Sequence, residues 1–391
     1  MSNVIVSFSR TPIGSFLGSL ESVSSPKLGA AAIAGAVTKA NLDLKQITQV
    51  IMGSVLPAGV GQAPARQAAI YSGLSDAVNC LTINKMCGSG LESIILADQL
   101  IKNNPNEIII AGGMENMSQA PHYLLNSRSG TRLGEGKLVD GMIVDGLWDI
   151  YNDKHMGNCA EMCAEKFSIS REEQDDFAIQ SYERSQASIS NGTFDNEIVP
   201  VDINTRKGVL TIDKDEEPHR VSFEKLKTLR TVFQKDGTIT AGNASTINDG
   251  AAACLIMSED KSKELGMTPI ARIVDYSSHS HDPEWFTTAP ISSTQKLLKQ
   301  QNIKASEIDI YEINEAFSVV TLAAIKELNL DPQKVNPYGG AVSLGHPIGA
   351  SGARIMCTLL NSMISKDKKM GVSSICIGGG EALSVLVERI K

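Results

Sequence analysis

A cysteine placed just ahead of a helix-like segment is the first residue of this chain that could do chemistry. Cys87 lies in the stretch NKMCGSG, directly before the amphipathic run LESIILADQLI. Backbone N–H groups at the start of a helix favour a thiolate and lower the pKa of a cysteine from about 8.5. A small residue packed in the core is the ordinary alternative, and the local pattern does not decide between the two.

Three further polar residues stand at similar places. His346 lies on the glycine-rich stretch GGAVSLGHPIGASGAR, Cys376 ends the strand-like run of CIGGGEA, and Asn314 follows the strand-like run IDIYEI. A turn-stabilising histidine, a core cysteine and a helix cap are their ordinary alternatives. Because turns and strand ends converge on one rim in layered α/β folds, we expect these side chains to meet Cys87 there.

Such a set of side chains supports acyl transfer through a thioester. A thiolate attacks an acyl carbon, a histidine manages the proton, and glycine N–H groups hold the oxyanion. A second thiol suits a reaction that forms a carbon–carbon bond, because an α-carbon must first lose a proton.

The elements that position these residues follow from the pattern of the chain. Short runs rich in valine and isoleucine alternate with helical stretches such as PKLGAAAIAGAVTKANL, which predicts a layered α/β fold with a largely parallel sheet. One pattern occurs twice in the chain: a glycine- and serine-rich turn opens a helix, and a later apolar strand runs into glycines followed by glutamate. The first copy is CGSGLESIILADQL with NEIIIAGGMENMS, and the second is GHPIGASGARIMCTLL with GVSSICIGGGEALSVLV. This echo indicates a duplicated α/β unit, although common βα patterns alone can produce it. The more polar residues 121–239 predict an inserted, loop-rich region that builds a binding surface, with a capping box opening a helix at Ser170.

The composition of the chain limits the classes of partner that it can bind and the cellular compartment in which it is expected. The chain has 391 residues and a net charge of −8, which argues against a general nucleic-acid binder or a binder of anionic membranes. Seven irregularly spaced cysteines indicate a reducing compartment. We see neither a secretory signal nor a transit peptide in MSNVIVSFSRTPIG, no peroxisomal tripeptide in VLVERIK, and no apolar run near the roughly 18 residues of a membrane span. We therefore expect a cytoplasmic protein.

Taken together, the motifs resemble the thiolase family, and within it the acetoacetyl-CoA thiolases. The resemblance covers essentially the whole chain and rests on SFSRTPIGSF, GQAPARQAA, NKMCGSGL, AGGMENMS, HMGNCAE, TAGNASTINDGAAA, EINEAF, GGAVSLGHPIGASGAR and CIGGGEALSVLV. It implies an α/β thiolase fold of two duplicated five-layered α/β/α/β/α halves. The N-terminal half would comprise residues 1–120 and 240–268, and the C-terminal half would comprise residues 269–391. Residues 121–239 would form an inserted loop domain for coenzyme A binding and tetramerisation. A homotetramer or a dimer is implied.

The resemblance also implies an activity and roles for the four residues. The enzyme would be an acetyl-CoA C-acetyltransferase that joins two acetyl-CoA molecules to acetoacetyl-CoA and coenzyme A, and runs in reverse. Cys87 would take the acetyl group with His346 activating it, and Cys376 would remove the α-proton of the second acetyl-CoA. Asn314 would hold a water that forms one oxyanion hole with His346, while the amides of Cys87 and Gly378 would form the other. No metal and no tightly bound cofactor are implied, because coenzyme A is substrate and product.

Coenzyme A binding is carried over by motif match. The residues assigned to it are Leu147, His155, Met156, Arg220, Phe233, Ala241, Ser245 and Phe317. Met156 in the HMG triplet implies a pocket for short acyl chains, and Arg220, in a variable stretch, is equally well a solvated charge. A helical metal site of His155, Cys159 and Cys163 is disfavoured because it lacks a fourth ligand.

The chain also resembles the mitochondrial-type acetoacetyl-CoA thiolases, and two positions bear on whether it shares their substrate range and their activation by potassium. Phe286 matches a phenylalanine that accompanies acceptance of 2-methylacetoacetyl-CoA, but Thr287 follows where proline is usual, which leaves this acceptance open. Pro218 replaces the tyrosine that binds potassium in that subgroup, which puts potassium activation in doubt.

Three other functions compete with this interpretation. The first is a broader 3-ketoacyl-CoA thiolase of β-oxidation, and the second is a non-catalytic carrier of acyl-CoA or lipid. A nicotinamide enzyme is disfavoured because no G-x-G-x-x-G follows an early strand. The physiological direction of the reaction stays open.

Overall fold

The computed structural model of the protein describes residues 2–130 and 132–390, and its centre is a ten-stranded sheet built in two halves. The two halves join where Asn3–Ile5 of one strand pair with Ala271–Ile273 of another. The strands of the first half are β1 (Asn3–Arg10), β2 (Gly14–Ser15), β3 (Gln49–Gly53), β4 (Asn79–Ile83), β5 (Ile108–Asn116) and β12 (Asn248–Ser258). Those of the second half are β13 (Ala271–Ser280), β14 (Ile310–Ile313), β15 (Met370–Ile377) and β16 (Glu381–Arg389).

The two halves repeat one topology. The first runs in the order β1-β12-β5-β3-β4, with two antiparallel pairings followed by two parallel ones. The second runs β13-β16-β15-β14 with the same directions, and a parallel bridge between Tyr311 and Val335 stands where a fifth strand would pair. The echo in the sequence therefore corresponds to two copies of a helix that leads into a strand.

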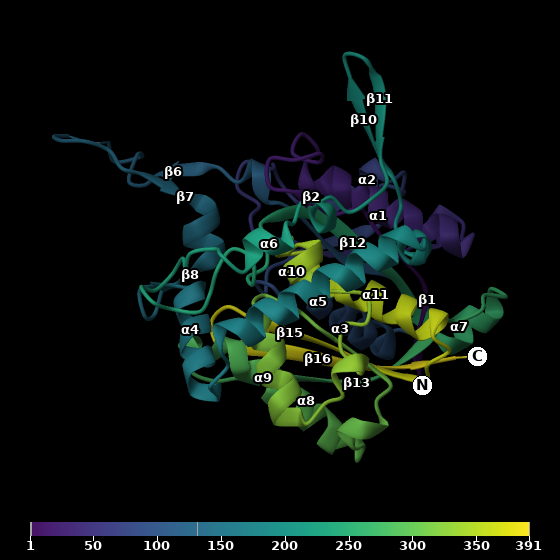
Figure 1. Ribbon diagram of the computed structural model, residues 1–391. Coiled ribbons are helices and arrows are strands. Elements are labelled where there is room, and N and C mark those ends of the chain that lie inside the picture. Colours follow the sequence, from purple (N-terminus) through teal and green to yellow (C-terminus); the bar gives the residue numbers. More distant parts are fainter. Residues whose placement is uncertain (1, 131, 391) are drawn as a thin grey trace.

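Helices fill three layers around the two half-sheets (Figure 1). The outer helices α1 (Ser25–Ala40) and α2 (Pro64–Tyr71) pack on the first half, and α8 (Ala289–Gln301) and α9 (Ser318–Leu328) lie on the outer side of the second. Between the half-sheets lie α3 (Ser89–Asn103) and α11 (Ser351–Ser365), which contact strands of both. The five layers therefore belong to the two halves together, with a shared middle layer, rather than to each half as the resemblance implied.

The middle helices α3 and α11 cross at their first turns with almost no side chain between them. A Cβ atom at Gly90 would lie 2.6 Å from the backbone nitrogen of Ala353, and one at Gly352 would lie 2.3 Å from that of Leu91. The residues Ser351–Met363 of α11 are all buried. Because the crossing is at the start of both helices, the loops that lead into them meet at one place.

The strands within residues 121–239 lie outside the central sheet, and the segment contacts that sheet through a parallel bridge between Ile198 and Arg10. The strands β6 (His122–Leu124), β7 (Leu138–Asp140), β8 (Trp148–Asp149), β9 (Lys154–His155), β10 (Val201–Thr205) and β11 (Gly208–Ile212) form three separate hairpin-like pairs. The pairs β6–β7 and β10–β11 project from the body as two arms (Figure 1). The helices of this segment are α4 (Met156–Phe167), α5 (Arg171–Ser190) and α6 (Phe223–Leu226), and α5 begins with the expected capping box of Ser170 and Glu173. The division into domains remains a prediction.

A buried arginine ties this segment to the sheet. Arg10 on β1 donates from Nε to Glu197 at 2.6 Å and from both Nη atoms to Asp215 at 2.6 and 2.8 Å. Its guanidinium also lies 4.9 Å from the ring centroid of Phe194. Buried charges are tolerated only when paired in this way, so losing one partner would be strongly destabilising.

The remaining helical elements are the short helices α7 (Glu259–Glu264) and α10 (Ala341–Leu344), a π-helical turn at Ile143–Leu147 and short 3₁₀ turns. Within residues 2–130 and 132–390, no helix combines the length and the apolar character that crossing a bilayer requires.

The crossing of α3 and α11 gives a first test. Replacing Gly352 with alanine should lower the free energy of unfolding by about 1–3 kcal/mol, because the added methyl group overpacks the contact with Leu91. Urea unfolding of the purified variant measures the change. Gly250→Ala is the matched control, because its nearest neighbour would lie at 3.4 Å, and equal losses in both variants would contradict the account.

Candidate active site

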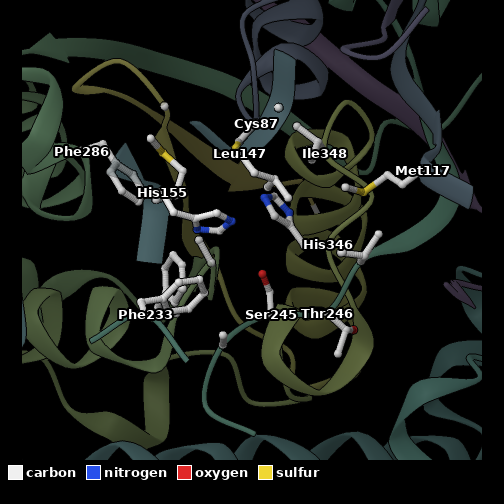
Figure 2. A pocket seen from close by; sticks show the side chains of 17 residues that line it. Cys87, Met117, Leu147, His155, Phe233, Ser245, Thr246, Phe286, His346 and Ile348 are labelled. Carbon is white, nitrogen blue, oxygen red and sulfur yellow. The ribbon is translucent and has the colours of Figure 1, made fainter. Parts of the chain in front are cut away.

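One cavity of about 220 Å³ receives side chains from both halves and from the inserted segment (Figure 2). Most residues predicted for the site line it, namely Cys87, Leu147, His155, Met156, Phe233, Ser245, Phe317, His346 and Gly378. Phe286 and Ile348 also line it. Cys376, Asn314, Arg220 and Ala241 do not, and their positions are given below.

The turn before α3 places Cys87 in the wall of this cavity. Met86 has the left-handed φ of 47°, and Ser89 Oγ accepts the N–H of Lys85 at 2.8 Å and donates to the Met86 carbonyl at 2.6 Å. Gly88 lets the turn approach β15, because a Cβ atom there would lie 2.4 Å from Cδ1 of Ile377. The thiol is thus held by packing against the other half of the molecule.

The pKa of Cys87 is a correction to the sequence analysis. Burial raises the pKa of this thiol to about 11, although hydrogen bonds from the backbone N–H groups of Gly378 and Cys87 act in the opposite direction. The negative charge of Glu115 also raises the pKa. The prediction of a lowered pKa was therefore wrong for this state, because desolvation outweighs the dipoles at the helix start.

His346 is buried and fixed through both its backbone and its ring. Its N–H donates to Asn248 Oδ1 at 2.9 Å, and its Nδ1 lies 2.6 Å from Ser351 Oγ. Since the Ser351 hydroxyl donates to the Pro347 carbonyl at 2.9 Å, we assign the ring proton to Nδ1. Nε2, which has no partner among the described residues, then carries a free lone pair.

The same burial keeps the imidazole neutral. Desolvation lowers the pKa of His346 to about 3, and the positive charge of Arg354 adds to the effect. The thiol and the imidazole are therefore both uncharged at neutral pH. A neutral imidazole with a free Nε2 can accept a proton from a thiol, which is the task of a general base.

Cys376 and Asn314 are both fully buried and do not line the cavity. Burial raises the pKa of Cys376 well above its usual range, and the neighbouring thiol of Cys87 raises it further. Asn314 follows β14 and donates its backbone N–H to Ser374 at 2.9 Å. Neither the nitrogen nor the oxygen of its side-chain amide has a partner among the described residues.

An ion pair joins the turn that carries Cys87 to the loop that follows β15. Gly378 directly follows β15, and Gly379 and Gly380, with φ of 96° and 87°, lead from it to Glu381 at the start of β16. The carboxylate of Glu381 lies 2.5 Å from Nζ of Lys85, two residues before Cys87. Because both side chains are about one-third exposed, this pair orients the loops more than it stabilises the fold.

Aromatic rings form the wall on the side of the inserted segment (Figure 2). The ring of Phe233 stacks on His155 with centroids 4.7 Å apart and meets Phe317 edge-on at 6.3 Å. Gly157 permits this approach, because a Cβ atom there would lie 2.2 Å from the Phe233 ring. His155 Nδ1 accepts the N–H of Gly157 at 3.1 Å, and burial lowers the pKa of its ring. No group of three side chains suited to a metal occurs among the described residues.

Arg220 and Ala241 line a second, more open hollow of about 560 Å³. It shares Phe233 and Ser245 with the first cavity, so the two are neighbouring parts of one surface depression. Arg220 is exposed and pairs with Glu216 at 3.3 Å. The structure therefore places these two residues at the outer end of the depression, away from Cys87.

Several residues of the site were not found by sequence reasoning. Asn248 and Ser351 fix His346, and Ile348 lies beside the thiol. The Ser-Gly pair occurs at residues 89–90 and again at 351–352, and this repeat could have pointed to Ser351. Both serine hydroxyls donate a hydrogen bond to a carbonyl of the turn that starts their helix. Asn248 lies in a distant segment, and nothing in the sequence around it indicates a contact with His346.

A duplicated α/β fold that brings a thiol and an unprotonated imidazole to one cavity defines a class of acyltransferases that work through cysteine. The family model "Thiolase, N-terminal domain" matches residues 3–260, and "Thiolase, C-terminal domain" matches residues 267–389. The chain belongs to the thiolase family, which confirms the predicted family, fold and acyltransferase class.

Similar proteins cover the chain almost end to end. It is 49% identical to acetyl-CoA acetyltransferase 2 of Arabidopsis thaliana over 98% of this chain and 96% of that protein. It is 48% identical to the acetyl-CoA acetyltransferase of Schizosaccharomyces pombe, over 99% of this chain and 98% of that protein. A crystal structure of the Acat5 thiolase from Ascaris suum in complex with coenzyme A superposes with a TM-score of 0.94 at 42% identity, covering both chains completely.

The raised pKa of Cys87 predicts how the free enzyme reacts with iodoacetamide. Because the thiol pKa is about 11, the rate of alkylation should rise through pH 7, 8 and 9 without reaching a plateau. Stopped incubations analysed by mass spectrometry of the peptide give the rate at each pH. A plateau near neutral pH would show that the thiolate is already formed and would contradict the proposed dominance of desolvation.

Proposed function

We propose that the protein is an acetyl-CoA C-acetyltransferase, which converts two acetyl-CoA molecules into acetoacetyl-CoA and coenzyme A and also catalyses the reverse thiolysis. One observation carries the proposal: Cys87, His346 and Gly378 face one small cavity at the meeting of two duplicated halves. The names of the relatives in Arabidopsis thaliana and Schizosaccharomyces pombe support acetyl transfer, and the complex of the Ascaris suum thiolase supports coenzyme A as the ligand.

In the first half-reaction, Cys87 becomes acetylated. Nε2 of neutral His346 accepts the thiol proton while the sulfur attacks the thioester carbon of acetyl-CoA. The N–H groups of Cys87 and Gly378, which point toward the sulfur, would stabilise the oxyanion that forms on the acetyl group. The carbon–sulfur bond to coenzyme A then breaks, and the leaving sulfur takes a proton from the thiol of Cys376.

In the second half-reaction, the carbon–carbon bond forms. The thiolate of Cys376 removes an α-proton from the second acetyl-CoA, and the resulting carbanion attacks the acetyl group on Cys87. The Cys87 sulfur leaves and recovers its proton from His346, so that all protons balance. A thiol whose pKa lies well above the usual range yields a strongly basic thiolate, as this proton transfer requires.

Asn314 and His346 would stabilise the thioester oxygen of the second acetyl-CoA while it carries negative charge. The support is the side-chain amide of Asn314, which is buried without a partner among the described residues and so is free to hold a water. Leu147, His155, Met156, Phe233, Ser245 and Phe317 would bind the pantetheine end of coenzyme A, because they line the cavity beside Cys87. Arg220 and Ala241 would contact its nucleotide end in the outer hollow.

The size of the cavity favours short acyl chains. Met156 and Phe286 are buried side chains that close the cavity, whereas a 3-ketoacyl-CoA thiolase of broad range needs room for a longer chain. A non-catalytic carrier would not need both thiols and the histidine, all of which are present.

We also propose a homotetramer in the cytoplasm. The arm formed by β6 and β7 carries the exposed leucines Leu124, Leu125, Leu133 and Leu138, which a second copy could cover. All seven cysteines are free thiols, as in a reducing compartment.

Trapping the acetyl intermediate tests the proposed nucleophile. Brief incubation of the native enzyme with acetyl-CoA should add one acetyl group to the peptide that contains Cys87, and Cys87→Ser should abolish both the label and thiolysis of acetoacetyl-CoA. Mass spectrometry of acid-quenched digests gives the result. Label that persists on another peptide of Cys87→Ser, with none on Cys87 of the native enzyme, would refute the assignment.

Shortening Met156 tests the chain-length preference. Met156→Ala should raise thiolysis of 3-ketohexanoyl-CoA relative to acetoacetyl-CoA by about tenfold, since removing side-chain atoms opens space for added methylene groups. Met162→Ala on the same helix, whose side chain lies outside the cavity lining, should leave the ratio unchanged. Comparable rates of the native enzyme on acetoacetyl-CoA and 3-ketooctanoyl-CoA would instead favour the broad-range alternative.

A further inference from the structure

A fully buried carboxylate joins the two halves beside the cavity. Glu115, near the end of β5, accepts the N–H of Val55 at 2.8 Å and that of Gly349 at 2.9 Å with Oε2. Its Oε1 accepts the N–H of Leu56 at 3.2 Å. Val55 and Leu56 follow β3 in the first half, whereas Gly349 belongs to the second-half loop that carries His346.

The surrounding backbone is packed so that this contact has little freedom to shift. A Cβ atom at Gly349 would lie 2.7 Å from Oε2 of Glu115. Cβ atoms at Gly113 and Gly53 would lie 2.0 and 2.8 Å from the carbonyl oxygen of Gly349. The loop of His346 therefore enters a slot of glycine backbone in the first half, and the carboxylate of Glu115 supplies the acceptor for its N–H group.

The position of this loop affects both reacting side chains. Gly349 lies between Ile348, which lines the cavity, and the turn at Ser351, which holds Nδ1 of His346. Ile348 packs in one apolar cluster with Val55 and Leu56, and Cys87 packs against that cluster. A shift of the loop would therefore change the separation of His346 and Cys87.

The contact requires an acceptor. Three backbone N–H groups point at Glu115, and the Ser54 hydroxyl lies 3.5 Å from Oε1. A glutamine in this place would direct its NH₂ group at one or more of these N–H donors, which leaves buried donors unsatisfied.

We propose that Glu115 is a positioning residue for acetyl transfer: its carboxylate holds Gly349, and through it His346, in register with Cys87 across the junction of the two halves. The inference rests on the proposed function, because it acts through the assigned pair of Cys87 and His346. Glu115 itself touches neither of the expected reacting atoms.

Steady-state thiolysis of acetoacetyl-CoA by Glu115→Gln tests this role. We expect kcat to fall by about tenfold or more while the KM for acetoacetyl-CoA changes by less than about threefold, because misplacing a catalytic group mainly affects the chemical step. Glu161→Gln is the matched control, since Glu161 is a buried carboxylate that accepts the N–H groups of Thr238 and Ile239 away from the His346 loop. Its kcat should stay within about twofold of the native value.

A double variant separates positioning from a general loss of structure. Adding Glu115→Gln to His346→Asn should reduce the residual single-turnover rate by less than about twofold, because a residue that acts through His346 has nothing left to position. Should Glu115→Gln fail to fold, the same measurements are made on Glu115→Asp. This variant keeps the charge, but its side chain is one methylene too short to reach all three amides. A kcat equal to that of Glu161→Gln, or full additivity with His346→Asn, would overturn the inference. Full activity of His346→Asn alone would instead overturn the proposed function.

Discussion

The close crossing of α3 and α11 is the constraint on which the rest of the structure depends. Glycines at the second position of both helices let the backbones touch at their first turns, so the two N-termini converge between the half-sheets. Cys87 leads into one helix and His346 into the other. A duplicated fold thus brings together two unlike residues from equivalent places, and the cavity lies where the two copies meet.

Burial at this junction also decides the electrostatics of the site. Two helix N-termini should favour a thiolate, yet desolvation raises the pKa of Cys87 to about 11 and lowers that of His346 to about 3. The free enzyme therefore holds a neutral thiol beside a neutral base. In this account, charge appears only while the substrate is bound, when the N–H groups of Cys87 and Gly378 face a developing oxyanion.

Much of this arrangement could be predicted from the sequence. Glycine-rich turns beside apolar runs led to Cys87, His346 and Cys376, and the end of a strand-like run led to Asn314, because turns and strand ends cluster at one rim of an α/β fold. The direction of the shift in the pKa of Cys87 could not be predicted, because it depends on how far the opposite half of the molecule shields the thiol from water. Residues that act through long-range contacts, such as Asn248 and Glu115, were missed for the same reason: their partners lie 98 and 234 residues away in the chain.

A crystal structure of the enzyme frozen after brief exposure to acetyl-CoA tests the central claim most directly. The account predicts an acetyl group on the Cys87 sulfur, its carbonyl oxygen within hydrogen-bonding distance of the N–H groups of Cys87 and Gly378, and Nε2 of His346 facing the sulfur. An acetyl group on Cys376, or a carbonyl oxygen turned away from both amides, would contradict it.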